Sequence, residues 1–564
     1  MTNTRPPTVE IPVLIAGGGP VGFSASIMLS RFGVRSLLVE RHPGTSIHPK
    51  ARGINARTME VLRQFGVEQA VRDAGLSREK VRYIIWTRSL AGEELERRTP
   101  GRSTEPVQQL SPTTNCLCAQ DDLEPVLRTF AEAHGPGQLR FNTEVTGFRQ
   151  NGDGVTATVV DRSSGRATSV RAQYLIAADG ARSRCRELLG IQMQGEPALY
   201  RSLNILLRAD LTPWVADRPS ALYFVEQPGL RGTFLTINGV NRWGFLVNNL
   251  PVDDERSADL SEEQCIEIVR RAAGVPDLEV EILGAVSWVA AAQVAERYQE
   301  GRVFLTGDAA HHMPPTGGFG MNTGIQDVHN LAWKLAAVLD GWAAPALLDS
   351  YAAELLPHSP ATTEQSLRNA TSMGRGVQPD NGEPAAPAGR ARPEFLNEQG
   401  MIYGAVYDSA AVIPDGTPLP VVANAVTDYL PVARPGSRAP HVWLQRGEER
   451  LSTLDLFGDA FVLLVGRLGS GWQAAGREVA RVLVVPLQAY TVGMGSDLAD
   501  PDGSWRDVYD IEEDGAVLVR PDGHVAWRCR SNLPNPAAEL HRALTGILGR
   551  MPAAERIEEM ARLR

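Results

Sequence analysis

The hydrophobic positions of this sequence begin with a strand, a glycine turn, a helix and a second strand. The apolar run 11–16 predicts a buried strand that leads into a glycine-rich turn. Apolar residues then recur at helical spacing as far as Phe32, and Gly33 ends this helix. The run 36–40 predicts a second buried strand that closes on Glu40. We interpret this order of elements as one βαβ unit.

Alternation with period two dominates the middle of the chain. It runs from 138 to 177 and breaks at glycine-rich turns, which predicts a β-meander. Residues from about 190 to 290 are strand-rich and aromatic, and we expect them to form a second sheet that covers a substrate. A strand at 303–306 then returns the chain to the first unit. Apolar residues spaced i, i+3 and i+7 predict a helix over 324–339.

The last part of the chain forms a further unit. The Pro-, Gly- and Ala-rich stretch 378–393 predicts a linker. Beyond about 434 follow a buried strand at 460–465 and a hairpin that turns at Asp522-Gly523. The predicted fold class is α/β (α+β), a Rossmann-like domain with an inserted β-sheet domain and a separate C-terminal domain. The expected boundaries are 1–190 and 296–375 for the first domain, 191–295 for the inserted sheet, 376–433 for the linker and 434–564 for the C-terminal domain.

Composition and charge narrow the class of protein. The 564 residues exceed what one hydrophobic core holds, and 43% hydrophobic with 22% charged residues is an ordinary globular balance. The formal net charge of −10 argues against a nucleic-acid partner. No apolar stretch approaches a membrane span and no signal peptide is evident, so we expect no membrane contact and a cytoplasmic location. Five scattered cysteines favour a reducing compartment and indicate neither a disulfide framework nor a metal site.

The glycine turn after the first strand carries a dinucleotide fingerprint. Gly17, Gly19 and Gly22 are spaced G-x-G-x-x-G between a strand and a helix, and Glu40 closes the next strand. Such glycines let the backbone approach a pyrophosphate at the helix N-terminus, and the acidic residue accepts from ribose hydroxyls. A purely structural glycine turn is the alternative, and this motif by itself does not separate NAD from FAD. The candidate contacts are Gly17, Gly19, Pro20, Val21, Gly22, Glu40 and Arg41.

Two later motifs favour FAD. The strand at 303–306 delivers Asp308 into a turn, where a carboxylate suits the ribityl hydroxyls that FAD has and NAD lacks; a plain helix cap is the lesser alternative. The glycine loop 314–324 then leads into a helix. Its backbone N–H groups would face the flavin pyrimidine edge, and the positive end of the helix dipole would stabilise an anionic reduced flavin. The candidate contacts are Gly307, Asp308, Pro315, Gly318, Gly320, Met321 and Asn322.

A third motif is Asp179-Gly180, which follows the strand at 174–177. Asp-Gly after a strand is often only a turn. With both other motifs present, we interpret Asp179 as part of a second turn beside the cofactor.

These motifs, in this order and spacing, resemble the single-component (group A) flavoprotein aromatic hydroxylases. The likeness covers nearly the whole chain and is closest to bacterial phenol hydroxylases of the dichlorophenol type and to enzymes that tailor aromatic polyketides and indolocarbazoles. It implies FAD as cofactor, NAD(P)H as transient reductant, and a flavin C4a-hydroperoxide that hydroxylates a small phenolic or polycyclic substrate with dioxygen. It also implies a homodimer and a thioredoxin-like C-terminal domain, although the chain has no Cys-x-x-Cys for a redox role.

The resemblance also assigns roles to single residues. Gln120 matches a family FAD contact, and Arg52 falls in the loop that lies along the isoalloxazine. Eukaryotic simple-phenol hydroxylases carry an acidic residue at the position of Arg52, so this departure favours a larger, acidic or polyoxygenated substrate. Pro315 matches the proline whose carbonyl faces the substrate ring. Arg52 and Pro315 are therefore the candidate catalytic residues.

Some alternatives stay open. A flavin-dependent halogenase is disfavoured because the chain lacks a Trp-x-Trp-x-Ile-Pro segment. Baeyer–Villiger or oxidative rearrangement chemistry needs the same groups, and an accessory flavoprotein that only binds an unstable intermediate fits as well. His311 and His312 are more typical of structural residues than of a general base. The aromatic and basic residues proposed for the substrate pocket fit a core equally well; they are Tyr200, Arg201, Tyr223, Trp243 and Trp288.

Overall fold

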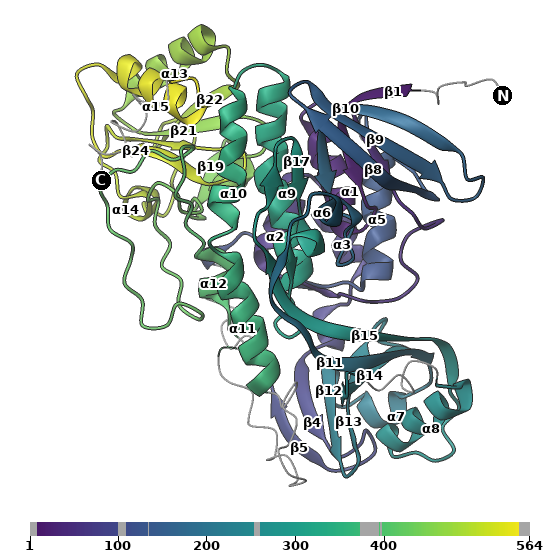
Figure 1. Cartoon of the computed structure of the whole chain (residues 1–564). Coiled ribbons are helices and arrows are strands. Elements are labelled where there is room, and N and C mark those ends of the chain that lie inside the picture. The colour runs from purple at the N-terminus through teal and green to yellow at the C-terminus, as the bar shows by residue number, and fades with distance from the viewer. Residues whose placement is uncertain are drawn as a thin grey trace, which may run out of the picture.

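The computed structural model describes residues 8–99, 109–133, 135–252, 260–372, 394 and 397–551. Figure 1 shows a first sheet at the upper right, a second sheet at the bottom and the C-terminal unit at the upper left. None of the described helices is long and apolar enough to cross a membrane. The mixed α/β fold class and the sheet-based units agree with the prediction.

The first sheet is parallel at its centre. Strand β1 (Thr8–Ala16) lies between β10 (Ala167–Ala177) and β2 (Ser36–Val39) and runs parallel to both. Two further parallel strands, β7 (Gln138–Arg140) and β17 (Val303–Leu305), extend this central group on its two sides. Because the carboxyl ends of parallel strands meet at one edge, the turns that follow β1, β10 and β17 lie side by side.

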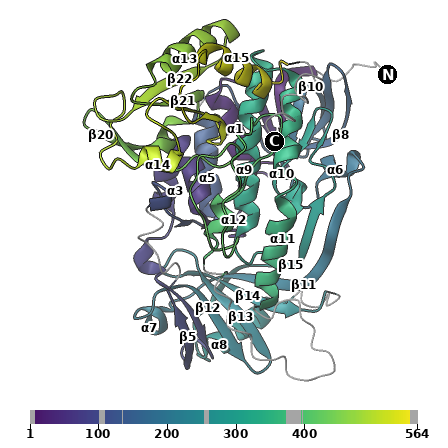
Figure 2. The same ribbon diagram turned by 90° about the vertical axis from the view of Figure 1, so that its left-hand side faces the viewer.

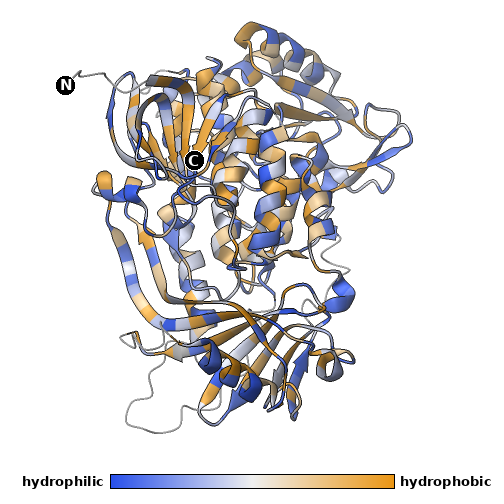
Figure 3. Cartoon of the chain, turned by 90° about the vertical axis from the view of Figure 1, so that its right-hand side faces the viewer, coloured by the Kyte–Doolittle hydropathy of each residue, from blue (hydrophilic) through white to orange (hydrophobic). Residues whose placement is uncertain are grey.

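Antiparallel strands complete the first sheet and confirm the predicted meander. Strand β8 (Thr143–Asn151) pairs with β9 (Gly154–Asp161), which pairs with β10, and β16 (Gln299–Glu300) pairs with β17. The strands of this sheet are largely hydrophobic (Figure 3). Helices pack against it and include α1 (Pro20–Arg31), α2 (Ala56–Gln64), α3 (Glu68–Ala74), α5 (Gln120–Ala133), α6 (Arg184–Leu188) and α9 (Phe319–Leu339).

Helix α9 begins five residues before the predicted start at Gly324. Gly318 adopts a left-handed conformation, with φ of 69°, and serves as the N-cap. The glycines that looked like loop residues therefore belong to the first helical turn. This shift places the N–H groups of Gly320 and Met321 where an α-helix leaves them without intrahelical partners.

The second sheet is larger than the inserted segment 191–295. It contains β4 (Tyr83–Thr87) and β5 (Glu94–Arg98), because β4 pairs in parallel with β12, far along the chain. Local periodicity gives no sign of such a pairing. The remaining strands are β11 (Met193–Arg208), β12 (Ser220–Gln227), β13 (Leu230–Thr236), β14 (Arg242–Leu250), β15 (Glu281–Ala295) and β18 (His311–His312), with α7 (Thr212–Val215) and α8 (Glu262–Ala273) beside them.

The C-terminal unit is built on a four-stranded sheet. Strand β21 (Phe461–Gly466) runs parallel to β22 (Leu487–Val492) and antiparallel to β23 (Ala516–Val519), which pairs with β24 (Val525–Cys529). The last pair confirms the predicted hairpin. The other described elements of this unit are β19 (Trp443–Arg446), β20 (Glu449–Ser452), α13 (Ser470–Leu483), α14 (Trp505–Tyr509) and α15 (Pro536–Ile547).

The segment between α9 and the C-terminal unit is packed in part. Helix α10 (Ser350–Leu355) lies beside the C-terminal unit, and α11 (Ser359–Ser372) continues from it toward the second sheet, with α12 (Gln399–Tyr403) nearby (Figure 2). The side chains of Tyr403 and Tyr407 are buried. The part of the predicted linker 376–433 that follows α12 has no regular helix or strand, and none of residues 413–432 is buried, whereas the stretch 378–393 lies outside the described residues.

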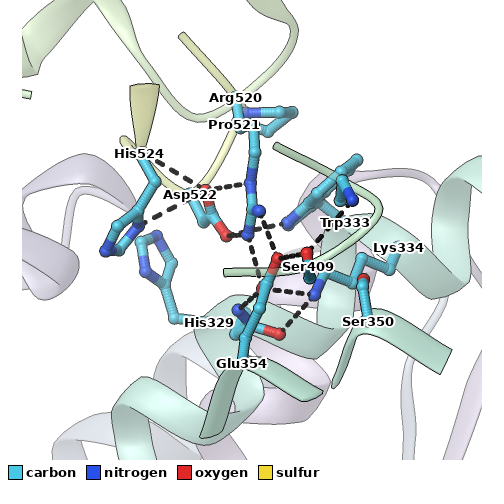
Figure 4. A network of polar contacts seen from close by, with 12 residues as sticks. His329, Trp333, Lys334, Ser350, Glu354, Ser409, Arg520, Pro521, Asp522 and His524 are labelled. Carbon is cyan, nitrogen blue, oxygen red and sulfur yellow. Dashed lines mark hydrogen bonds and ion pairs between the residues drawn. The ribbon is translucent and has the colours of Figure 1, made fainter. Parts of the chain in front are cut away.

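A buried network of charges joins the C-terminal unit to α9 and α10 (Figure 4). Arg520 donates to both carboxylate oxygens of Glu354, at 2.5 and 2.9 Å, and is also paired with Asp522. Lys334 Nζ lies 2.7 Å from Glu354 Oε2. Each of these charged groups has an oppositely charged partner, so the C-terminal unit is fixed to the first domain by ion pairs that water does not reach.

Candidate functional site

A cavity of about 2260 Å³ lies between the first sheet and the second sheet. Its lining comes from the turns after β1, β10 and β17, the loop 39–55, the first turn of α9 and strands of the second sheet. Pockets for one small ligand occupy roughly 300–1,000 Å³. The cavity therefore has room for a cofactor and a substrate together.

The turn after β1 requires glycine at two positions, because backbone atoms lie too close for a Cβ. Gly17 has φ of 107°, and a Cβ there would lie 2.2 Å from the carbonyl oxygen of Ala178. A Cβ on Gly22 would lie 1.9 Å from the carbonyl oxygen of Gly17. Gly19, by contrast, borders open space at the N-terminus of α1, where N–H groups and the helix dipole favour an anion.

Glu40 stabilises this turn through hydrogen bonds to its side-chain carboxylate. Its carboxylate accepts hydrogen bonds from the backbone N–H of Gly18, at 2.6 Å, and of His42, at 2.8 Å. The residue also lines the cavity. Glu40 thus holds the turn in shape as well as facing the position that the fingerprint assigns to a ribose.

The two predicted aspartates differ in how their carboxylates are used. Asp179 accepts from Oγ of Ser183, the N-cap of α6, at 2.5 Å and from the N–H of Cys185 in the first turn at 3.0 Å, so its carboxylate is occupied at the start of α6. Asp308 lies in the 3-10 turn η3 (Gly307–Ala309), and its side chain is exposed to the cavity. Asp308 is therefore the better placed of the two to bind a ligand hydroxyl.

A buried carboxylate that sequence reasoning missed positions this turn. Asp327 accepts from the N–H of Gly307 at 2.8 Å and contacts His311 Nε2 at 2.9 Å. Burial opposes the charged form of His311, but Asp327 outweighs it, and the pKa of His311 is raised. The signal was present, because Asp327 falls between Ile325 and Val328 on the buried side of α9. His311 is thus a structural residue.

The first turn of α9 is tied to the loop that carries Arg52. Pro315 O accepts from the N–H of Gly318 at 3.1 Å. Asn322 Nδ2 donates to the carbonyl oxygens of Gly53, at 2.9 Å, and Gly318, at 2.6 Å. Its Oδ1 accepts from the N–H of Asn55 at 3.0 Å. The side chain of Asn322 therefore fixes the loop against the helix.

Arg52 reaches from that loop to the second sheet. Its guanidinium donates to the carbonyl oxygens of Thr236, at 2.8 Å, and Ala221, at 2.7 Å. Within the described ranges it forms no ion pair with a carboxylate, and burial lowers its pKa to about 10. Gln120 holds the same loop, because its Oε1 accepts from the N–H of Ala51 at 3.3 Å. A positive charge thus lines the cavity without a protein counter-ion among these residues.

The candidates for the substrate pocket separate into two groups. Arg201 and Trp288 line the cavity. Tyr223 and Trp243 are buried in the core of the second sheet, and Tyr200 packs against Trp288. The apolar lining also includes side chains that the alternating pattern did not single out, namely Leu222, Phe224, Leu235, Leu246 and Val289.

The structure brings the predicted cofactor residues to this one cavity. Every one of them lines it except Gly22 and Gly307, which shape the turns behind it. The open Gly19 cradle, the exposed carboxylate of Asp308 and the free N–H groups at the start of α9 suit the pyrophosphate, the ribityl chain and the ring edge of FAD. Together with the apolar wall, they fit a flavin dinucleotide with an apolar ligand beside it.

Comparisons with known proteins agree. Residues 10–366 match the family described as FAD binding domain, and residues 432–551 match the aromatic-ring hydroxylase C-terminal domain. The chain is 44% identical to a putative polyketide hydroxylase of Streptomyces halstedii, over 96% of each chain. It is 41% identical to the 4-methyl-5-nitrocatechol 5-monooxygenase of a Burkholderia species, over 97% of this chain and 99% of that one.

A solved structure gives the same result. The flavin-dependent monooxygenase PieE, determined in complex with FAD and substrate, is similar to this chain with a TM-score of 0.88 and 34% identity. The match covers 97% of this chain and all of the other. The chain therefore belongs to the family of FAD-dependent aromatic-ring hydroxylases, and the predicted family, cofactor and enzyme class, an FAD-dependent monooxygenase, are confirmed.

Proposed function

We propose that this enzyme hydroxylates a phenolic or polycyclic aromatic substrate with NAD(P)H and dioxygen. The observation that carries the proposal is the single cavity in which the FAD motifs of the first domain face an apolar wall of the second sheet. Bound FAD, once reduced by the nicotinamide, supplies the activation of dioxygen. The cytoplasm, where NAD(P)H is available, is the compartment that fits.

The residues that would hold FAD belong to four separate segments. The turn at Gly17 and Gly19 binds the pyrophosphate, and Glu40 serves the ribose. Asp308 serves the ribityl hydroxyls, and the first turn of α9 supplies N–H donors and the positive end of the helix dipole. Gln120 and Asn322 act indirectly, because both fix the loop on which Arg52 lies.

The charge and shape of the cavity support a large, acidic or polyoxygenated substrate. Arg52 has only backbone carbonyl partners among the described residues, so a substrate oxyanion or carbonyl oxygen would provide its counter-charge. Its fixed position would orient the aromatic ring relative to Pro315. The names of the relatives, a polyketide hydroxylase and a nitrocatechol monooxygenase, favour the same class of ring.

The apolar wall has a second role. Trp288, Leu246 and the side chains beside them exclude water from the substrate, which protects a reactive oxygen species from wasteful decay. Uncoupled NAD(P)H oxidation should therefore increase when this wall is made polar. The same enclosure serves hydroxylation and oxidative rearrangement alike.

A test with isotopic oxygen separates the proposal from its alternatives. Phenols and polycyclic quinones are screened for stimulation of NAD(P)H oxidation by the holoenzyme, and the product of each hit is analysed after reaction under ¹⁸O₂. One labelled oxygen in a new ring hydroxyl supports hydroxylation. A labelled lactone oxygen would replace the proposal with Baeyer–Villiger chemistry, and tight binding without turnover would replace it with an accessory role.

A further inference from the structure

One carboxyl group outside the predicted set also lines the cavity. Glu398 immediately precedes α12 and is half-buried. It lines the same cavity as Trp288 and Pro315. None of the motifs considered above includes it, because its segment was expected to be a linker.

Two amide side chains hold this carboxyl group in place. Gln365 Nε2 donates to Asn369 Oδ1 at 2.9 Å, which fixes the orientation of the Asn369 amide. Asn369 Nδ2 then donates to Glu398 Oε1 at 2.7 Å. No described residue forms a hydrogen bond with the other oxygen, Oε2. Glu398 therefore retains one oxygen for a ligand in the cavity.

The position of this group is on the substrate side of the cavity. A Cβ on Gly317 would lie 3.1 Å from Asn369 Nδ2, so the amide touches the turn that Pro315 begins. The next residue of α11, Ala370, packs with Tyr200 and Ala290 of the second sheet. Glu398 thus lies where the turn before α9 meets the second sheet.

The surroundings of Glu398 populate both its protonated and its ionised form near neutral pH. Burial raises the pKa of Glu398 to about 8, and the hydrogen bond from Asn369 opposes this rise only in part. No charged side chain of the described residues on α9, α11, α12 or the second sheet contributes to this pKa. A carboxyl group with such a pKa can both donate and accept a proton at cellular pH.

We propose that Glu398 exchanges a proton with a hydroxyl group of the aromatic substrate, on the basis of its place in the wall of the cavity, the hydrogen bond that holds its Oε1, and its Oε2, to which no described residue is bound. In this step the substrate O–H bond breaks, the proton passes to the carboxylate of Glu398, and the electron pair stays on the substrate oxygen. The resulting phenolate is more nucleophilic at its ortho and para carbons. The proton returns to the oxygen when the product forms, so the group is regenerated.

This proposal rests on the proposed function and narrows its substrate class. It requires a substrate that carries a hydroxyl group ortho or para to the carbon that receives the new oxygen. Arg52 would bind a second oxygen of the same molecule, since its guanidinium lines the same cavity and donates to carbonyl oxygens of the second sheet.

The test follows the proton rather than turnover. Oxidised FAD-loaded enzyme, without NAD(P)H, is saturated with 4-nitrophenol, which has a single ionisable hydroxyl group, and the visible absorbance of the bound phenolate is recorded from about pH 6 to pH 10. Two coupled groups titrate in two steps. We expect two steps for the wild type and for Glu364→Gln, an exposed control on α11. A single step is expected for Glu398→Gln, in which the amide oxygen still accepts from Asn369.

Two further readings complete the experiment. Asn369→Ala removes the hydrogen bond that favours the ionised carboxylate, so the first step should move to higher pH. With an accepted substrate, Glu398→Gln should lower kcat by about 100-fold or more, while thermal unfolding and FAD content remain those of the wild type. Two steps in Glu398→Gln, or one in the wild type, would overturn the role of Glu398. Absence of oxygenation by the wild type would instead overturn the proposed function.

Discussion

Arg52 and Arg520 are two guanidinium groups in contrasting surroundings, one at the wall of the cavity and one at the junction with the C-terminal unit. Arg520 is fully buried between the carboxylates of Glu354 and Asp522, and its pKa is raised. The guanidinium of Arg52 donates hydrogen bonds only to backbone carbonyl oxygens among the described residues, and burial lowers its pKa to about 10. The charge of Arg520 is neutralised by the protein and holds domains together, whereas the charge of Arg52 is left without a carboxylate partner among the described residues.

The largest expected effect comes from breaking the junction. Arg520→Leu leaves Glu354 and Asp522 without their main counter-ion, which should lower the free energy of unfolding by about 3–5 kcal/mol. Urea denaturation measures this loss. Arg542→Ala is the matched control, because Arg542 forms an exposed pair on α15 and should cost less than about 1 kcal/mol. Equal losses in the two variants would contradict the structural role of the junction.

The same junction should make stability depend on acidity. Burial raises the pKa of Glu354, but Arg520 and Lys334 outweigh it and lower this pKa from 4.5 to about 2. Glu354 therefore contributes stability that is present above about pH 4.5 and is lost as the pH falls toward 2, a contribution of about 3 kcal/mol. Thermal melts across this range should show a fall that Glu354→Gln flattens. An unchanged slope in that variant would argue that other carboxylates cause the acid sensitivity.

Arg52 should affect activity rather than stability. Arg52→Ala removes a charged donor from the cavity, so kcat/KM for an accepted substrate should fall about 10- to 100-fold, as expected for a hydrogen bond to a charged group. The free energy of unfolding in urea and the FAD content of the purified protein should change little. A large loss of stability with unchanged kcat/KM would reverse the comparison, because Arg52 would then resemble Arg520.

The smallest effects should distinguish the two aspartates of the cavity. Asp308→Asn should weaken FAD binding by about tenfold, because its exposed carboxylate is available to ligand hydroxyls. Asp179→Ala removes two hydrogen bonds at the start of α6 and should cost about 1 kcal/mol of stability with a smaller effect on FAD affinity. Fluorescence titration with FAD measures both affinities. Equal losses of FAD affinity would mean that Asp179 also binds the cofactor.

The sequence predicts the cofactor side of the cavity well, because the information there is local. Gly22 is required by a contact with Gly17 in the same turn, and Asp308 follows shortly after a buried strand, whereas the close contact of Gly17 is with Ala178 after the distant strand β10. The start of α9 was placed too late because Gly318 and Gly320 look like loop residues, although a left-handed glycine also caps a helix.

The substrate side depends on tertiary contacts that one sequence does not reveal. Strand β4 joins the second sheet through a parallel pairing with β12, which lies more than a hundred residues later in the chain. Asp327 and Glu398 acquire their roles only when Gly307 and Asn369 are brought against them. Alternation marks the strands of the second sheet, but it does not say which of their two faces lines the cavity.

The central claim is that cofactor and substrate occupy one chamber, with Arg52 at its wall. The most direct measurement is the absorption spectrum of the oxidised, FAD-loaded enzyme as an accepted aromatic substrate is added. We predict a saturable perturbation of the flavin bands that is weaker or needs more substrate in Arg52→Ala. Saturable binding of the substrate that leaves the flavin spectrum unchanged would contradict the shared chamber.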